Sequence, residues 1–375
     1  MNQLNKHNWR ALLVLLVLAW LHGAQYALLL PPWGLIDEAQ HLDYVVHLAT
    51  QHRLPNAMTD LLSADIVQSL FTTNHWQTFQ WPTPSTVQEV YASPVGHSYE
   101  AYQPPLYYFL MLPFMLNMPG DILVRLFGLR LVTVTLSLLP VYLLYRTTLL
   151  LAPDSRLALL VTFLLLSLPE RTFAVSRVNN DSLVEVMGAG FCYVSTQVWL
   201  LGWTRKRAIL LGLLLVCGVW AKLSMLFWLV PLTGALWLHR QPDRRHSLWS
   251  YAIAGIGILL LFGRNLLLYG DITGYGAFRG LYELPKPAYT LPVAVAAVGD
   301  LFKHLWMIWW KGASPEPNLF LNLCYLALAL LTIAGLAQLF RQLNGARQAR
   351  QWTNRDHVLL FYLIAILIYA ASILG

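Results

Sequence analysis

Apolar runs of about 20 residues, separated by short basic clusters, constrain this 375-residue chain more than any other feature. A run of that length is what an α-helix needs to cross the hydrocarbon core of a bilayer. Hydrophobic residues make up 57% of the chain and charged residues 11%, whereas a typical globular domain has about 25% charged residues. The sequence therefore predicts an all-α polytopic membrane protein, because a helix satisfies its own backbone hydrogen bonds inside lipid.

The basic clusters predict the orientation of the spans. The net charge is +7, but Lys and Arg residues stand between the apolar runs, which is typical of cytoplasmic loops rather than of a nucleic-acid surface. We therefore expect a cytoplasmic N-terminus and no nucleic-acid partner. The clusters expected in the cytoplasm are Arg146 with Arg156, Arg205 to Arg207, Arg244 with Arg245, and Arg341 to Arg350.

The same rule favours one crossing rather than two between Gln103 and Arg146, since two crossings would put every later basic cluster outside. About nine transmembrane helices result, within one membrane domain over residues 1–375 that has no soluble C-terminal domain. The predicted spans are Ala11–Leu30, the single crossing after Gln103, Leu157–Ala174, Leu183–Trp203, Ile209–Trp220, Met225–Leu238, Leu248–Leu268, Leu319–Phe340 and Val358–Leu374.

A long polar loop, residues 31–102, separates the first two spans, and we expect it on the extracytoplasmic side. Its first part predicts an interfacial helix lying on the membrane surface, because polar and apolar residues fall on opposite helical faces. Asp37 and Glu38 begin this helix, so they are either capping charges for its positive end or functional carboxylates. The polar residues near one face are Asp37, His41, Tyr44 and Gln51.

Cations on the same outer side are candidate ligands of an anionic lipid headgroup. A charge at a helix centre in a bilayer costs about 2.5 to 3.5 kcal/mol, so such residues persist when they pair or work. Arginine offers phosphate a bidentate fork and lysine a point charge. We expect Lys222, Arg264 and Arg177 to bind a donor phosphate; the alternative is that they snorkel to lipid phosphates.

The carboxylates suit acid/base chemistry, because Asp37 or Glu38 could take a proton from an acceptor hydroxyl. A divalent metal ion is the alternative, although no spacing matches a metal signature. No Gly-rich phosphate loop is present, which argues against a cytosolic nucleotide donor. The further candidate contacts with substrate or metal are His41, His97, Gln103, Tyr107, Asn180, Asp181 and Asp271.

The order of these motifs resembles the GT-C superfamily of integral membrane glycosyltransferases, especially the branch of protein O-mannosyltransferases and lipid A aminoarabinose transferases. The family's usual His-Pro-Pro reads Gln-Pro-Pro here. The matching pieces are Asp37-Glu38, Gln103-Pro104-Pro105-Leu106-Tyr107, Arg177 to Asp181, Lys222-Leu223-Ser224, Arg264-Asn265 and Tyr269-Gly270-Asp271.

That resemblance implies transfer of a sugar, with inversion, from a polyprenyl-phosphate-linked donor to an acceptor hydroxyl. The acceptor would be a lipid, a glycan or a protein on the extracytoplasmic face of a bacterial plasma membrane. By the same resemblance, Asp37 takes the position of the catalytic base and Glu38 assists or orients it.

A transporter or lipid-binding membrane protein without transferase activity is the main alternative. Its charged groups would form a translocation path instead of an active site. Such folds usually show paired halves with broken helices in corresponding positions. The sequence shows no such pairing.

Overall fold

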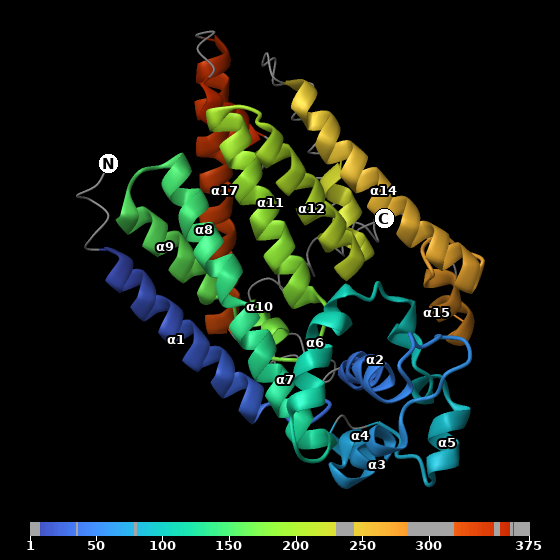
Figure 1. Cartoon of the computed structure of the whole chain (residues 1–375). Helices are drawn as coiled ribbons and strands as arrows, with labels where there is room; N and C mark the ends of the chain where they lie inside the picture. The colour runs from blue at the N-terminus through green and yellow to red at the C-terminus, as the bar shows by residue number, and fades with distance from the viewer. Residues whose placement is uncertain are drawn as a thin grey trace.

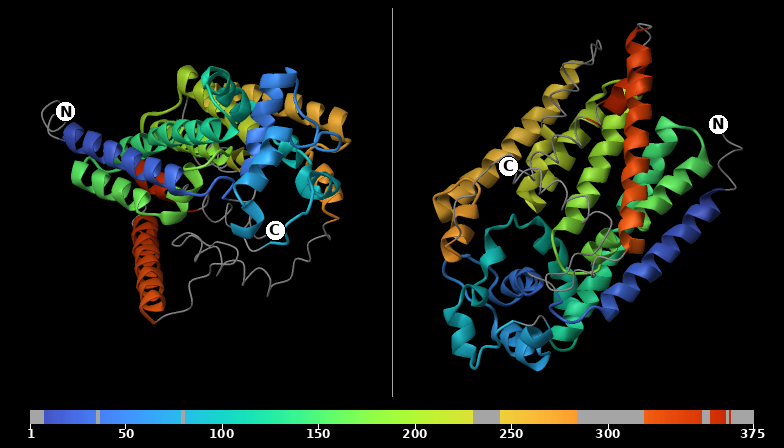
Figure 2. Two further views of the ribbon diagram at one scale, coloured as in Figure 1. Left: turned by 90° about the horizontal axis from the view of Figure 1, so that it is seen from below. Right: turned by 180° about the vertical axis from the view of Figure 1, so that it is seen from behind.

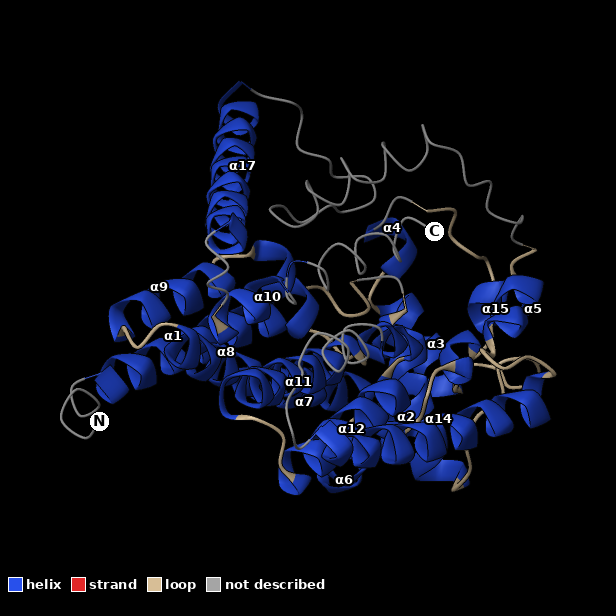
Figure 3. Ribbon diagram, turned by 90° about the horizontal axis from the view of Figure 1, so that it is seen from above, coloured by secondary structure: helices blue, strands red, loops and turns tan. Residues whose placement is uncertain are grey.

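The computed structural model describes residues 8–34, 37–78, 81–229, 244–283, 319–348, 353–360 and 363. Every regular element in these ranges is a helix, which confirms the prediction of an all-α protein (Figure 1 and Figure 3). The long helices run alongside one another as a bundle. The short helices of the loop gather at one end of that bundle, as Figure 2 shows from behind.

Four helices in the described part of the chain are long and apolar enough to cross a membrane. A fifth candidate is a pair of helices bent by 70°, α9 (Ser155–Leu166) and α10 (Pro169–Val175). By length and composition, these helices are compatible with an integral membrane protein, and within the described ranges they do not reach the predicted nine. The four are α1 (Asn8–Leu29), the continuous pair α7 (Ile122–Leu136) and α8 (Leu138–Leu151), α11 (Asp181–Leu201) and α14 (Ser247–Tyr269).

The other predicted spans are described in part. Helix α12 (Arg205–Ala221) covers the predicted span Ile209–Trp220 but has only 17 residues, and α17 (Leu319–Gln348) covers Leu319–Phe340. The predicted spans Met225–Leu238 and Val358–Leu374 lie mainly outside the described residues. The remaining short helices are η3 (Leu223–Trp228), η4 (Arg244–His246) and α15 (Tyr275–Leu281).

Helix length also bears on the number of crossings after Gln103. Helix α6 (Leu106–Asn117) has 12 residues, about 18 Å at 1.5 Å per residue, and so falls short of a hydrocarbon core of about 30 Å. The chain then breaks at Gly120, whose φ of 103° is left-handed, and Asp121 caps the first turn of α7. The 30 residues of α7–α8 are long enough, which fits a single crossing.

The loop between α1 and α6 folds around a buried helix. That helix, α2 (Glu38–Gln51), is buried at every residue from Glu38 to Leu48. This differs from the predicted helix on the membrane surface. The other loop helices are α3 (Ala64–Thr72), α4 (His75–Thr78), α5 (Val87–Ala92), η1 (Pro94–Gly96) and η2 (Tyr99–Tyr102).

Partners within the protein explain why α2 is buried. Asp43 accepts hydrogen bonds from the backbone N–H of Ser63 (2.8 Å) and from the hydroxyl of Ser98 (2.7 Å). Tyr44 stacks on Tyr108 of α6, with ring centroids 3.8 Å apart. An amphipathic pattern predicts two environments for a helix but does not say whether lipid or protein supplies them, and here protein groups satisfy the polar face.

A buried ion pair joins α2 to the bundle. Arg130 of α7 and Glu38 are each 1% exposed, and the guanidinium Nε and Nη2 donate to the two carboxylate oxygens at 2.8 and 2.5 Å. The other N–H groups of Arg130 donate to the carbonyls of Ala27, Leu30 and Pro31 at the end of α1. All five guanidinium N–H groups are thus paired, so one side chain holds α1, α2 and α7 together.

We expect Arg130→Met to destabilise the protein by about 3 to 5 kcal/mol, because it leaves the Glu38 carboxylate buried without a cation. Thermal unfolding in detergent measures the effect. The matched control is Arg53→Met: Arg53 also pairs with a carboxylate, that of Asp60 at 2.6 Å, but its side chain is 48% exposed. An exposed pair contributes at most about 1 kcal/mol, so equal destabilisation by the two substitutions would contradict the assignment.

Candidate active site

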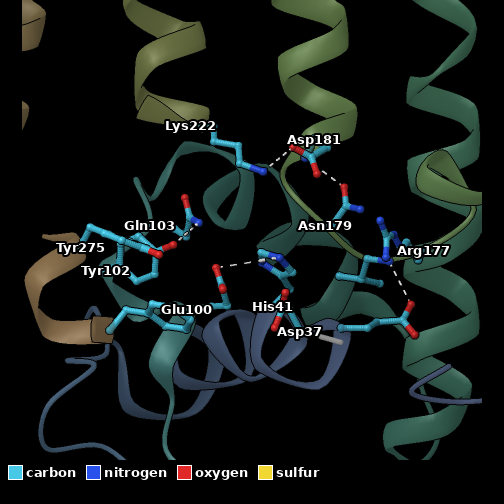
Figure 4. A pocket seen from close by; sticks show the side chains of 13 residues that line it. Asp37, His41, Glu100, Tyr102, Gln103, Arg177, Asn179, Asp181, Lys222 and Tyr275 are labelled. Carbon is cyan, nitrogen blue, oxygen red and sulfur yellow. Dashed lines mark hydrogen bonds and ion pairs between the residues drawn. The ribbon is translucent and has the colours of Figure 1, made fainter. Parts of the chain in front are cut away.

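A cavity of about 280 Å³ lies where the loop meets the ends of the long helices. Its walls come from the start of α2, from η2, from the turn before α11, from the end of α12 and from α15. Acids, cations and aromatic rings surround one space, as Figure 4 shows. The lining residues are Asp37, Glu38, His41, Glu100, Tyr102, Gln103, Arg177, Val178, Asn179, Asp181, Lys222, Tyr275 and Phe278.

Asp37 lies directly before α2. Together with His41 and Glu100 it forms one side of the cavity, which we call the floor (Figure 4). Its backbone is left-handed, with a φ of 80°, a conformation that Asp adopts more readily than most residues. The hydroxyl of Tyr99 donates a hydrogen bond to its carboxylate. Burial raises the pKa of Asp37, against the effects of this hydrogen bond and of nearby cations. A higher pKa makes a carboxylate a stronger base.

His41, one helical turn after Asp37, is an uncharged part of the floor. Its Nδ1 lies 2.8 Å from the hydroxyl oxygen of Tyr108. Burial and the positive charge of Lys222 lower the pKa of His41 to about 3. The imidazole is therefore neutral at pH 7 and serves as a hydrogen-bonding group rather than as a cation.

Glu100 of η2 completes the floor. The residue is 5% exposed, and its Oε2 lies 4.0 Å from Nε2 of His41. This oxygen has no hydrogen-bond partner among the described residues. Burial and the negative charge of Asp37 raise the pKa of Glu100 to about 8, so this carboxyl is largely protonated at pH 7.

Two cations lie away from the floor. Lys222 follows the last residue of α12, and its Nζ donates to Oδ1 of Asp181 at 2.6 Å. The guanidinium carbon of Arg177 lies 5.4 Å from the ring centroid of Phe173. Nε of Arg177 is buried and has no hydrogen-bond partner in the described chain, which leaves a donor for an anion.

Asparagines fix the turn that carries Arg177. The side-chain amide of Asn180 donates to Oε1 of Gln103 at 3.2 Å and to the carbonyl of Ala221 at 2.9 Å. Oδ1 of Asn179 accepts from the backbone N–H of Asp181 at 2.9 Å. Asn180 thus ties the start of α11 to the end of α12 and to the residue after η2, so it positions the cavity wall rather than lining it.

The structure brings most of the predicted residues together at this cavity. Glu38 reaches it only as a paired group, because Arg130 and the backbone N–H of Val178 occupy its oxygens. Besides Asn180, four predicted residues do not line it. They are His97, Tyr107, Arg264 and Asp271.

These four residues have other contacts or surroundings. The hydroxyls of Tyr107 and Thr133 lie 3.1 Å apart, and Nη1 of Arg264 donates to Oδ1 of Asn265 at 2.8 Å. Asp271 accepts from Thr273 and from the backbone N–H of Gly276, which orders the start of α15. His97 follows η1 and forms an isolated antiparallel β-bridge with Leu61. A role of Arg264 in phosphate binding remains a prediction.

Glu100, Tyr102, Tyr275 and Phe278 line the cavity but do not belong to the residues predicted from the sequence. The first two lie within three residues before the Gln103-Pro104-Pro105 motif, so extending that motif upstream would have included them. The aromatic residues of α15 have no such signal, because only the fold brings that helix against η2.

The hypothesis of a metal site is not supported by the grouping of side chains. Within the described ranges, no three His, Cys, Asp or Glu residues are arranged to hold a metal ion. The residues with suitable donor atoms lie in these ranges and form no such group: Asp37, Glu38, His41, His97 and Asp181.

Comparisons of this chain with protein-family models, with curated proteins and with solved structures find no match.

Proposed function

We propose that this protein is a membrane glycosyltransferase that moves a sugar from a polyprenyl-phosphate-linked donor to an acceptor hydroxyl, on the plan of the GT-C superfamily. One observation carries the proposal: a half-buried carboxylate, Asp37, shares a cavity with two cations, Lys222 and Arg177, next to apolar helices. The combination suits a substrate that has an anionic phosphate, a reacting hydroxyl and a lipid chain.

In the proposed reaction, Asp37 removes the proton of the acceptor hydroxyl as its oxygen attacks the anomeric carbon of the sugar. The bond between that carbon and the phosphate oxygen breaks, and its electron pair leaves with the phosphate. Lys222 and Arg177 stabilise the negative charge that develops there. Attack from the face opposite the phosphate inverts the anomeric centre. Glu38 acts by holding the start of α2, and hence Asp37, through Arg130.

An apolar groove offers space for the prenyl chain of the donor. It has a volume of about 640 Å³ and lies between α6 and α7–α8. Helix α6 starts three residues after Gln103, so only Pro104 and Pro105 separate a residue of the cavity wall from a helix that lines the groove. The groove is lined by Leu110, Met111, Phe114, Met118, Gly128, Leu131, Val132, Thr135, Leu136 and Leu139.

The proposal includes the topology expected from the sequence: about nine crossings of a bacterial plasma membrane, a cytoplasmic N-terminus and an extracytoplasmic cavity. Its support is that the loop helices, two of which line the cavity, lie at the opposite end of the bundle from the connections α8–α9 and α11–α12 (Figure 1). Those connections carry the basic residues Arg156 and Arg205 to Arg207.

Single cysteines test this topology. In a variant whose three native cysteines are replaced by alanine, we expect Gln88→Cys to react with an impermeant maleimide added outside intact cells. Lys206→Cys should react only after the membrane is made permeable. Both positions are exposed on the protein surface, so a difference in labelling would come from the membrane and not from burial. Labelling of position 206, but not position 88, from outside would reverse the orientation.

Asp37→Asn tests the catalytic base. Asn keeps the size of the side chain and tolerates the left-handed backbone, but it cannot accept the proton. Transfer from a panel of synthetic polyprenyl-phosphate sugars, measured in nanodiscs, should fall about 10²- to 10⁴-fold, with unfolding temperature unchanged. Asp65→Asn, an exposed acid at the start of α3, is the control and should remain fully active. Normal turnover in Asp37→Asn would eliminate Asp37 as the base.

Lys222→Met tests the phosphate site, because Met keeps the length of the side chain and removes its charge. The loss of a charge-assisted contact of about 1.5 to 3 kcal/mol should weaken donor binding about 10- to 150-fold. Arg264→Met is the comparison and should weaken binding less, because Arg264 does not line the cavity. Equal weakening, measured by calorimetry, would contradict this ranking and favour Arg264 as a phosphate ligand.

A further inference from the structure

The charges that line the cavity do not balance when every acid is ionised. Glu38 can be set aside, because Arg130 neutralises it outside the open space. The other lining acids in the described chain are Asp37, Glu100 and Asp181, and the cations are Lys222 and Arg177. Full ionisation leaves one excess negative charge, and His41 is neutral and does not offset it. A mono-anionic phosphodiester would be repelled by such a site.

Hydrogen bonding distinguishes Glu100 from the other two acids. Asp181 forms an ion pair with Lys222 at 2.6 Å, and the carboxylate of Asp37 accepts the hydroxyl of Tyr99. Oε2 of Glu100 is buried without a hydrogen-bond partner in the described residues, and Nε2 of the neutral His41 imidazole lies 4.0 Å away. Gln103 forms a hydrogen bond with the Glu100 side chain that favours the ionised form, but burial outweighs it. A buried carboxylate oxygen without a donor is disfavoured, whereas a protonated carboxyl has its own O–H to donate.

We propose, on the basis of the proposed function, that Glu100 holds a proton whenever the phosphate of the sugar donor is bound in the cavity. Binding of the anion and binding of this proton are then linked. The neutral carboxyl then removes the excess charge and leaves Asp37 as the ionised acid of the floor. Its O–H group faces the cavity as a donor to a substrate oxygen. Glu100 is thus a positioning residue for the charge of the site.

The pH range follows from the environment of Glu100. Burial and the charge of Asp37 raise its pKa to about 8, so the proton is present below that pH and is lost as the pH rises through it. Because the two acids repel each other, the proton belongs to the pair, and the burial of Glu100 assigns it to that residue. The groups that face Glu100 are Asp37 before α2, His41 of α2, Tyr99 and Tyr102 of η2, Gln103, Tyr108 of α6, Asp181 of α11, Lys222 after α12 and Tyr282 after α15.

None of these neighbours accounts for a change between pH 7 and pH 9. The pKa of His41 lies far below this range. Burial, which is partial for Tyr102 and Tyr282, raises the pKa of each tyrosine above its ordinary value and keeps the hydroxyls neutral. Asp181 stays paired with Lys222. A change in anion affinity over this range would therefore report on Glu100 with Asp37.

The experiment measures binding of a prenyl methyl phosphate to the full-length protein in nanodiscs. This phosphodiester probe keeps a single negative charge throughout the pH range used. With Glu100 as the linked group, the dissociation constant should rise about tenfold from pH 7 to pH 9, and tenfold per pH unit beyond that. Calorimetry in two buffers of different ionisation enthalpy should find close to one proton taken up per probe bound at pH 9, and close to none at pH 6.5.

Glu100→Gln is the decisive variant, because Gln is neutral at every pH and keeps a donor group. Its affinity for the probe should change less than twofold between pH 7 and pH 9, and it should bind no proton with the probe. Glu89→Gln, an exposed glutamate of α5 away from the cavity, should keep the steep profile of the parent protein. Infrared spectra at pH 7 should show a protonated carboxylic acid band in the parent protein that is absent from Glu100→Gln.

Different results overturn different parts of the argument. Binding that is independent of pH in the parent protein, without proton uptake at pH 9, would overturn the role of Glu100 and leave the phosphate site intact. The same steep profile in Glu100→Gln would assign the linkage to another group and also overturn it. Absence of probe binding at every pH would overturn the proposed phosphate site and the linkage together. If the Gln variant does not fold, proton uptake by the parent protein alone decides the question.

Discussion

The ion pair between Glu38 and Arg130 is the interaction on which the arrangement of the site depends. Desolvating two charges is costly, and the geometry compensates for it by pairing both carboxylate oxygens and all five guanidinium N–H groups. The partners come from the end of α1, the start of α2 and the middle of α7. The backbone N–H of Val178, which also donates to Glu38, adds the turn before α11. The loop is therefore fixed to the bundle where the cavity forms.

The adjacent acids Asp37 and Glu38 have different roles because only Glu38 is paired with Arg130. Glu38 lies inside the first turn of α2, and Arg130 holds its charge. Asp37 lies one residue earlier, just before the first turn of α2. Its backbone is left-handed, and its carboxylate lies at the cavity. A local pattern of two acids at a helix start is compatible with capping, with structural pairing and with catalysis. The partners of each acid separate these roles, with Arg130 for one and Tyr99 for the other.

The chemistry of the cavity follows from the small number of cations and hydrogen-bond donors that are available to its acids. Lys222 is committed to Asp181, so the floor receives only part of the positive charge in its surroundings. Burial then favours the neutral form of Glu100, whose Oε2 has no hydrogen-bond partner among the described residues. A floor with one ionised acid, one neutral acid and one neutral imidazole can both accept a proton and tolerate an anion. The aromatic rings of η2 and α15 contact one another at one side of the cavity, where the ring centroids of Tyr102 and Tyr275 lie 5.8 Å apart.

The sequence by itself determined the all-α class, the four to five apolar helices that could cross a membrane and most residues that line the cavity, because long apolar runs and isolated charges beside them have few other physical explanations. It also placed Asp37, Gln103, Arg177, Asp181 and Lys222 in one group. Tertiary structure decided what the sequence pattern left open. The polar face of α2 meets protein instead of lipid, Arg130 rather than the solvent takes the charge of Glu38, and Glu100 and α15 enter the cavity. Those outcomes depend on which distant groups become neighbours, and neither helical periodicity nor motif order encodes contacts such as that between residues 38 and 130, since both describe only local spacing along the chain.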